Sequence, residues 1–398
     1  MRRPSNHVDV RFSDKRLTTQ KYESLAVTTD RAADGGSMVF SLLGLFGETG
    51  SLLSEVKKKQ RDSSSYVGYE KAVTEELGDV LWYLTVLASR LKTSLSRIAH
   101  HVAYGSSAMS EAPDVRFAML QHPTLPFPGT PTPAFEGTLL MLASEVGALL
   151  REHSTSDLFI DRAATEQRLV DVLGLLVKAA NEAGITLEEA ASENLNKVLD
   201  RWPKERIYPE PFDRDALEWE QLPRMLTVDV FERTVAGQTY VYQQCNGIII
   251  GDRLTDNAPE PDDYRFHDVF HYANAAILGW SPVIRDLFHL KRKSNPAIDE
   301  SEDGARPALI EEGVVAWIFG QAESLDFFTG LKPGELPFGL LKQVRQFVGK
   351  YEGGRCPLWV WEEAILQGYA AFRFVRDHRR ARFHIDLRAR TLTAETLP

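Results

Sequence analysis

The sequence "GETGSLLSEVKKK", residues 47–59, has the apolar spacing of a helix that packs into a core. A helix turns by about 100° per residue, so residues three and seven positions apart lie close together on one side. Glu48, Ser51 and Glu55 therefore share a stripe, while Leu52 can point into the core. Carboxylates on one side of an otherwise buried helix either face solvent or hold a cation.

The partner of this helix is "TEELGDVLWYL", residues 74–84. Glu76 and Asp79 lie three residues apart, and Glu75 lies four residues before Asp79, so these carboxylates share a face. Together with Glu48 they repel one another unless a positive charge lies among them. A hard divalent cation such as Mg²⁺ binds oxygen ligands of this kind and also binds substrate phosphates. Spacing alone leaves open the alternative of two amphipathic helices with solvated acidic faces.

Composition narrows the class of protein. The chain has 398 residues and a net charge of −10, which argues against broad, unspecific binding of nucleic acid. Its two cysteines, Cys245 and Cys356, lie far apart without the spacing of metal ligands, which favours a reducing compartment. The N-terminus has no apolar signal region, and we find no run of about 18 apolar residues that spans a membrane. We expect a cytoplasmic protein without a membrane partner.

Proline density and hydrophobic periodicity divide the chain into five segments. Residues 18–120 have the periodicity of helices, and the proline-rich residues 121–134 predict an extended linker. Helical periodicity resumes over residues 135–203, and prolines mark a second linker at residues 204–223. Residues 224–398 combine alternating Val, Thr, Tyr and Ile with helical segments, which predicts an α+β domain. The fold class is multidomain, with an all-α part followed by an α+β part.

The two helical segments are related to each other. "LLGLFGETGSLL" at residues 42–53 aligns with "LLMLASEVGALL" at residues 139–150. "DVLWYLTVLASRLKTSL" at residues 79–95 aligns with "DVLGLLVKAANEAGITL" at residues 171–187. Two copies of one helical unit, each with an incomplete apolar face, are expected to pack on each other. We therefore predict a helical bundle formed by a tandem repeat.

The pair "GLFGETGSLLSEVKKK" and "EELGDVLWYL" resembles the MazG-like family of all-α nucleoside triphosphate pyrophosphohydrolases. The resemblance extends over roughly residues 20–203, where "GITLEEAASENLNKVLDRWP" is similar to the end of a MazG unit. It implies a helical bundle that pairs with a second copy, within the tandem or as a homodimer. It also implies hydrolysis of a nucleoside or deoxynucleoside triphosphate to the monophosphate and pyrophosphate, with Mg²⁺ or Mn²⁺ as cofactor.

The family pattern is an E-x-x-E helix followed by an E-x-x-D helix. By this resemblance Glu48, Glu76 and Asp79 are the expected metal ligands. Ser51 stands where the family has the second acid, which is a departure from the pattern. Glu55, one turn further on, matches an additional acid and can compensate for Ser51.

The resemblance also implies a general base and contacts to the nucleotide. A carboxylate outside the ligand set, Glu55 or Glu75, is expected to act as the catalytic base, and the sequence does not choose between them. Asn194 and Lys197 match polar positions that the family uses near the nucleotide, although a solvated last helical turn is an equal alternative. Lys58 can reach a phosphate, or it can interact with the C-terminal dipole of its own helix.

The second copy is degenerate. Glu145 survives, but Ala148 replaces an acid, and Arg168 replaces the Glu that pairs with Asp171. The second copy has therefore lost its predicted metal cluster. We expect the acids of the first copy and the Asn–Lys pair of the second to form one composite site.

A second candidate site lies in the C-terminal domain. "DDYRFHDVFHYANAAILGW" places His267 and His271 four residues apart, which is the spacing of two ligands on one helix face. Glu311 and Glu312 open a later helix and can supply carboxylates. The site would bind a metal or a phosphorylated ligand. The alternative is that both histidines are partly buried and satisfied by neighbours such as Asp268.

Two classes of function follow. The first is an active pyrophosphohydrolase, supported by Glu48, Glu76 and Asp79. The second is a nucleotide-binding regulatory or defence-related protein whose MazG part senses nucleotides and whose C-terminal domain is the effector. Ser51 and the degenerate second copy favour this second reading.

Overall fold

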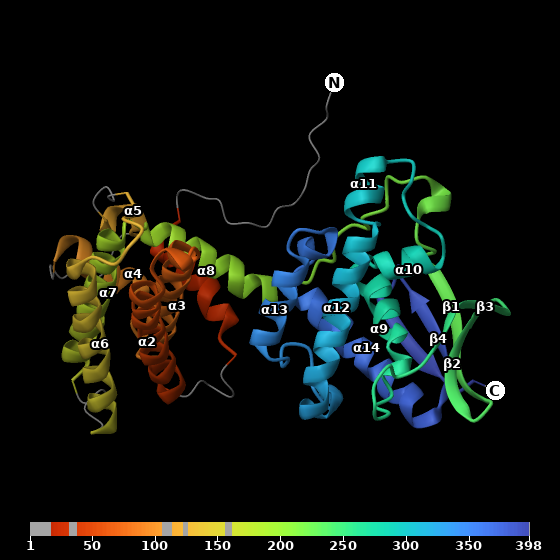
Figure 1. Cartoon of the computed structure of the whole chain (residues 1–398). Helices are drawn as coiled ribbons and strands as arrows, with labels where there is room; N and C mark the ends of the chain where they lie inside the picture. Colours follow the sequence, from red (N-terminus) through yellow and green to blue (C-terminus); the bar gives the residue numbers. More distant parts are fainter. Residues whose placement is uncertain (1–16, 32–37, 106–113, 122–125, 156–160, 398) are drawn as a thin grey trace. The chain divides into compact units, whose positions relative to one another are not determined.

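The computed structural model describes residues 17–31, 38–105, 114–121, 126–155 and 161–397. Two compact units make up the chain, residues 1–204 and 205–398, and each is described here by itself. Figure 1 shows that the first unit is built from helices and that the second contains both helices and a sheet. This arrangement agrees with the predicted combination of an all-α part and an α+β part.

The helices of the N-terminal unit begin at the polar caps that the sequence provides. Side chains of Thr18, Ser94, Thr132, Asp161 and Thr186 each accept a hydrogen bond from a backbone N–H of the helix that follows. The helices are α1 (Thr19–Ala26), α2 (Met38–Asp62), α3 (Tyr69–Arg90), α4 (Leu95–Tyr104), α5 (Phe117–Leu120), α6 (Pro133–Ser154), α7 (Arg162–Ala183) and α8 (Leu187–Arg201).

Two helix pairs form the centre of this unit. Helix α2 packs against α3, α6 packs against α7, and α2 also packs against α6. The shorter helices are exchanged between the pairs, because α8 packs on α3 while α4 packs on α7. At the crossing of α3 and α8, a Cβ atom on Gly78 would come within 2.5 Å of the Ala190 carbonyl oxygen. Only glycine allows this close approach.

Two of these helices are more apolar than the sequence analysis expected. By length and composition, residues Met38–Ser65 and Pro133–Ser154 are long and apolar enough to cross a membrane. Both helices also contribute buried side chains to the core of this unit, among them Leu52 of α2 and Leu142 of α6. A core helix of a water-soluble bundle passes the same test, so the location of the protein stays a prediction.

The proline-rich linker is shorter than predicted. Helix α6 begins at Pro133, inside the predicted linker 121–134, because proline is favoured in the first turn of a helix and Thr132 supplies the cap. Residues 126–132 contain no helix or strand, and Pro123 lies outside the described residues.

The C-terminal unit combines a five-stranded antiparallel sheet with helices. The strand order is β3-β2-β1-β4-β5, and β4 and β5 pair near the end of the chain. Turns at Ala236–Gly237 and Asn246–Gly247, each with positive φ at both residues, connect β1 to β2 and β2 to β3. The elements are β1 (Met225–Val235), β2 (Gln238–Cys245), β3 (Ile248–Leu254), α9 (Asp268–Ala273), a π-helix (Asn274–Leu278), α10 (Pro282–Leu287), α11 (Pro296–Ser301), α12 (Ala305–Ala322), α13 (Phe338–Val348), α14 (Leu358–His378), β4 (Arg380–Asp386) and β5 (Thr391–Glu395).

Most of the predicted second linker, residues 204–223, belongs to this unit. Asp213 is almost completely buried, and its carboxylate accepts hydrogen bonds from Arg285 and from the backbone N–H of Leu222. Arg224 forms a further ion pair with Asp213 at 2.8 Å. A buried carboxylate with this many partners anchors its segment, so the segment is not a free connector.

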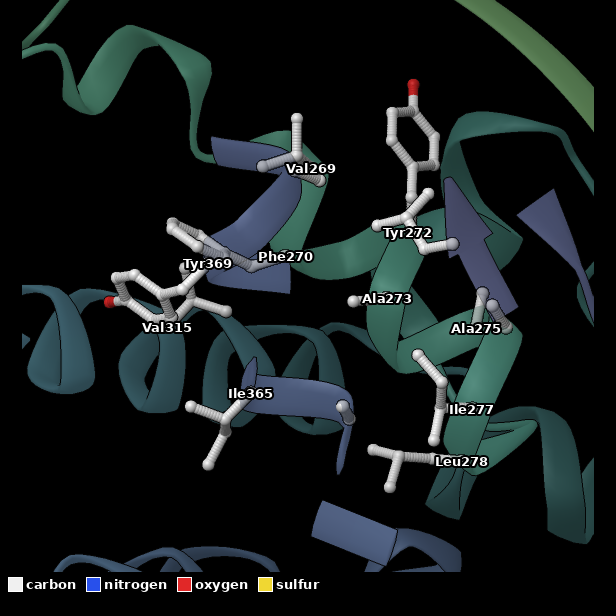
Figure 2. Packing of buried hydrophobic residues seen from close by; sticks show 14 of the residues in the cluster. Val269, Phe270, Tyr272, Ala273, Ala275, Ile277, Leu278, Val315, Ile365 and Tyr369 are labelled. Carbon is white, nitrogen blue, oxygen red and sulfur yellow. The ribbon is translucent and has the colours of Figure 1, made fainter. Parts of the chain in front are cut away.

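Helix α9 lies in the core of the C-terminal unit and packs against α12 and α14. Figure 2 shows the side chains of Val269, Phe270 and Ala273 among Val315, Ile365 and Tyr369. The ring of Phe270 lies 4.5 Å from the ring of Tyr369, measured between centroids. Apolar packing thus holds the short helix that carries the predicted histidine pair.

Candidate metal centres

Helices α2 and α3 bring three predicted ligands together. Glu48 of α2 and Glu76 and Asp79 of α3 each offer a carboxylate oxygen, and these oxygens all lie within 4.8 Å of one another. We call these three residues the acidic cluster. Its oxygen-only donor set matches the preference of a hard cation such as Mg²⁺.

The electrostatics of the cluster leave a place for positive charge. Burial, followed by the charges of Glu48 and Asp79, raises the pKa of Glu76 to about 8. Oε2 of Glu76 is buried without a hydrogen-bond partner in the described part of the chain. A bound cation would favour the ionised form of Glu76 and would give this oxygen a partner.

Helix α8 brings both polar residues that were expected near the nucleotide to the cluster. Nδ2 of Asn194 donates a hydrogen bond of 2.8 Å to Oδ1 of Asp79, and the Tyr22 hydroxyl donates one of 3.0 Å to Oδ1 of Asn194. Nζ of Lys197 forms an ion pair with Asp79 and lies 3.3 Å from Glu75. The two helical halves therefore meet at Asp79. Tyr22 had no signal in the sequence, since a lone tyrosine in an amphipathic helix resembles any core aromatic residue.

Lys197 carries its charge at this position. Burial disfavours its ammonium group, but Asp79 and Glu75 outweigh burial and raise the pKa of Lys197. The ammonium group therefore offsets part of the negative charge of the acidic cluster when no other cation is present.

Glu55 and Lys58 lie together but outside the acidic cluster. Nζ of Lys58 is 2.5 Å from Oε1 of Glu55, and the Tyr66 hydroxyl donates a hydrogen bond to Oε2 of Glu55. Glu55 was predicted as an additional acid or a base, and Lys58 was predicted to contact phosphate. In the structure the ammonium group of Lys58 and the carboxylate of Glu55 instead form an ion pair with each other. Ser51 is half-buried on the same helix.

The second helix pair neutralises its own acids. Nη1 of Arg168 lies 2.9 Å from Oε2 of Glu145, and its Nε lies 2.8 Å from Oε1 of Glu152. Asp171 accepts a hydrogen bond from Gln167. A guanidinium group thus pairs with both Glu145 and Glu152 of α6.

The C-terminal unit brings the remaining predicted residues together. His271 places its Nδ1 3.0 Å from Oε1 of Glu311 and its Nε2 3.3 Å from Oε2 of Glu312. Nε2 of His267 lies 3.8 Å from the same oxygen of Glu312 and 3.2 Å from Oδ1 of Asp268. Asp268, which the sequence analysis treated only as a neighbour, is therefore part of the group. Its position in the sequence, directly after His267, is the feature that could have indicated Asp268 as a member of this group.

Comparison with known proteins bears on the C-terminal unit. Residues 207–398 match the family model of the MazG C-terminal domain. The C-terminal unit is thus related to the MazG C-terminal domain. The "Gene 37 protein" of Mycobacterium phage L5 is 40% identical over 58 residues, which are 14% of this chain and 51% of that protein. The match therefore spans about half the length of the phage protein. No solved structure matches the chain. The family match supports a MazG relationship for this chain without testing the tandem repeat.

Proposed function

We propose that this MazG-related protein is a divalent-metal-dependent nucleoside triphosphate pyrophosphohydrolase. It would convert a nucleoside or deoxynucleoside triphosphate and water to the monophosphate and pyrophosphate. Residues 18–203 would form a MazG-like tandem whose second copy has lost its metal ligands. The observation that carries the proposal is the convergence of Glu48, Glu76 and Asp79 on adjacent core helices.

The acidic cluster fits a hard cation because its donors are carboxylate oxygens and one of them, Oε2 of Glu76, is buried without a partner in the described residues. Glu48, Glu76 and Asp79 would hold Mg²⁺ or Mn²⁺. When bound, such an ion neutralises triphosphate charge and lowers the pKa of a coordinated water. The role of α2 and α3 is to hold the carboxylates rigidly in place, since both helices are buried along their apolar sides.

Lys197 and Asn194 would bind and orient the substrate. Lys197 is charged and lies at the edge of the cluster, so its ammonium group can exchange Asp79 for a phosphate oxygen. The amide of Asn194 is oriented at both ends, by Tyr22 and by Asp79. Glu75 is the better-placed base, because its charge reaches Glu76 and its partner Lys197 would turn to the phosphate, whereas Glu55 is held by both Lys58 and Tyr66.

A nucleotide-binding regulator is the second function that a specific observation favours. The ion pair between Lys197 and Asp79 already supplies one positive charge to the cluster, and Ser51 removes one acid of the family pattern. In such a protein the nucleotide would bind without fast hydrolysis, and the C-terminal domain would act as the effector. A cytoplasmic location and a homodimer belong to both proposals.

Pyrophosphate release from a panel of nucleoside and deoxynucleoside triphosphates, with Mg²⁺ or Mn²⁺, tests the enzyme. Glu76→Gln and Asp79→Asn should each lower turnover by at least about 100-fold, since a metal contributes several kcal/mol to stabilising the transition state. Glu145→Gln on α6 is the matched control and should keep most of the activity. Metal-dependent nucleotide binding without pyrophosphate release would favour the regulator. Full activity in Asp79→Asn would remove the acidic cluster from the mechanism.

A further inference from the structure

We propose that the C-terminal unit holds a divalent transition-metal ion, of the Zn²⁺ type, between the imidazoles of His267 and His271 and the carboxylates of Asp268 and Glu312. This site is separate from the acidic cluster and does not depend on the proposed hydrolysis of nucleotides. It rests on the positions of four side chains from α12 and from the chain at the start of α9.

The donor atoms of the four residues converge. His267, Asp268 and His271 offer ligand atoms that all lie within 4.8 Å of one another. Oε2 of Glu312 joins them, at 3.3 Å from Nε2 of His271 and 3.8 Å from Nε2 of His267. Two nitrogen and two oxygen donors around one point form a donor set that transition ions accept and that Mg²⁺ does not favour.

The Nδ1 atom of each imidazole, which faces away from the proposed ion, already has a hydrogen-bond partner. Nδ1 of His267 is 2.9 Å from the carbonyl oxygen of Tyr264, and Nδ1 of His271 is 3.0 Å from Oε1 of Glu311. Both partners accept hydrogen bonds, so each Nδ1 carries a proton, and each Nε2 would offer its lone pair to a bound ion. Metal-binding histidines in proteins are held in this way by a carbonyl or carboxylate on the far nitrogen.

Glu311 has the contacts of a supporting residue, which corrects its prediction as a ligand. Its carboxylate is fully buried. Besides His271, it accepts hydrogen bonds from the side chains of Asn274 and Ser281 and from the backbone N–H of Val283, each at 3.0 Å. These four bonds fill the acceptor sites of a carboxylate, so none remains for a metal. Its role is to orient His271.

Asp268 is oriented by a second chain of hydrogen bonds. The side chain of Gln243 on β2 donates to Oδ2 of Asp268, and the Tyr272 hydroxyl donates to Oε1 of Gln243. This leaves Oδ1 of Asp268 beside Nε2 of His267. The ring of Tyr264 stacks on His267 with centroids 4.4 Å apart, which fixes the plane of that imidazole.

One atom of the group is left without a hydrogen bond. His271 is fully buried, and its Nε2 has no hydrogen-bond partner in the described residues, although Glu312 lies 3.3 Å away. An ion between Nε2 of His271 and Oε2 of Glu312 would give this buried nitrogen a partner. Glu312 is 40% exposed on its side chain, so an ion can reach the site from solvent.

Zn²⁺ titration of the full-length protein, after removal of metal by a chelator, tests this site. The background is Glu76→Gln/Asp79→Asn, so that the acidic cluster does not add to the signal. Glu312→Gln and His267→Asn should each weaken Zn²⁺ binding by at least about tenfold. Glu300→Gln, an exposed position on α11, is the matched control and should bind as the background protein does. Co²⁺ used as a second probe should give a visible spectrum with nitrogen ligands.

Melting temperatures without metal show whether each variant folds, and Glu312→Gln keeps the test valid if His267→Asn does not fold. Zn²⁺ affinity that is equal in Glu312→Gln, His267→Asn and Glu300→Gln would overturn the proposal. A background protein that binds no Zn²⁺ would overturn it as well. In both cases the histidines would serve only as ion-pair partners of Asp268, Glu311 and Glu312.

Discussion

The helix pairs α2–α3 and α6–α7 differ in how their carboxylates are neutralised. In α2–α3 the carboxylates of Glu48, Glu76 and Asp79 converge, and one oxygen of Glu76 has no partner among the described residues. In α6–α7 the guanidinium group of Arg168 binds Glu145 directly. The first pair therefore leaves room for a cation from solution, whereas the second takes its cation from its own chain.

Helices α8 and α4, which pack on α3 and α7 respectively, also differ in the side chains that they bring to each pair. Helix α8 places Asn194 and Lys197 at Asp79, while α4, which packs on α7, ends near Val102 and Gly105 at the aligned positions. Val102 and Gly105 have no side-chain groups that bind phosphate. Polar contacts between the two halves thus support one composite site, on the α2–α3 side.

Among the variants that test the difference between the two helix pairs, Lys197→Met should have the largest effect, on nucleotide affinity. The variant keeps the apolar stem of the side chain but removes the ammonium group that faces Asp79. A hydrogen bond between charged groups contributes about 1.5–3 kcal/mol, so nucleotide affinity should fall about 10- to 100-fold. Metal affinity without nucleotide should rise, since a competing cation leaves the cluster. Calorimetric titrations with Mn²⁺ and with a non-hydrolysable nucleotide measure both. Unchanged nucleotide affinity would place Lys197 outside the binding site.

Arg168→Glu would make the second pair resemble the first. The new carboxylate would face Glu145 and Glu152 without the guanidinium group that now binds them. We expect the melting temperature of the metal-free protein to fall by about 2–4 °C, which corresponds to about 1 kcal/mol. Millimolar Mn²⁺ should then restore part of the loss. Arg168→Gln is the control, because it removes the cation without adding an acid, and its response to Mn²⁺ should be smaller.

The pKa of Glu76 predicts a pH dependence of stability. Its pKa is raised from 4.5 to about 8 by burial and by Glu48 and Asp79. Between these values the folded state holds a proton that the unfolded chain has lost, so the free energy of unfolding should fall as the pH rises from about 5 to 8. Urea unfolding of metal-free protein across this range measures the slope. Glu76→Gln should flatten it, and Glu145→Gln should not. An equal slope in both variants would assign the effect to another group.

Ser51→Glu should have the smallest effect. The substitution adds the carboxylate that the MazG-like pattern has at this position, beside Glu48. Additional negative charge in a cation site raises metal affinity, by a factor of a few for a residue at the edge of the site. A Mn²⁺ titration of the variant against Ser51→Gln isolates the charge. Equal affinities would mean that residue 51 points away from the cluster.

The acidic cluster could be predicted because its spacing is local. Glu76 and Asp79 lie one turn apart on one helix, and helical geometry places them on one face in any fold. The same rule predicted that His267 and His271 are neighbours. Spacing along one element gives side-chain direction without knowledge of tertiary contacts.

Contacts between distant elements could not be predicted in this way. Gln243 on a strand supports Asp268 beside α9, and Tyr22 supports Asn194, although 172 positions separate the latter two residues. Such pairs depend on how the elements pack, and a single sequence gives no pattern for them. The pairing of Glu55 with Lys58 has the opposite cause. These two residues lie three positions apart on one helix, so helical spacing alone predicts their ion pair, whereas the family pattern predicts separate roles for them.

Gly78 lies directly before Asp79 and faces α8 with only a hydrogen atom. The Cβ of Asn194 would lie 2.9 Å from any Cβ at residue 78. A methyl group there would act as a wedge between α3 and α8 and would lengthen the 2.8 Å bond from Asn194 to Asp79. The width of a single carbon atom at this crossing therefore decides whether Asn194 on α8 reaches Asp79 on α3.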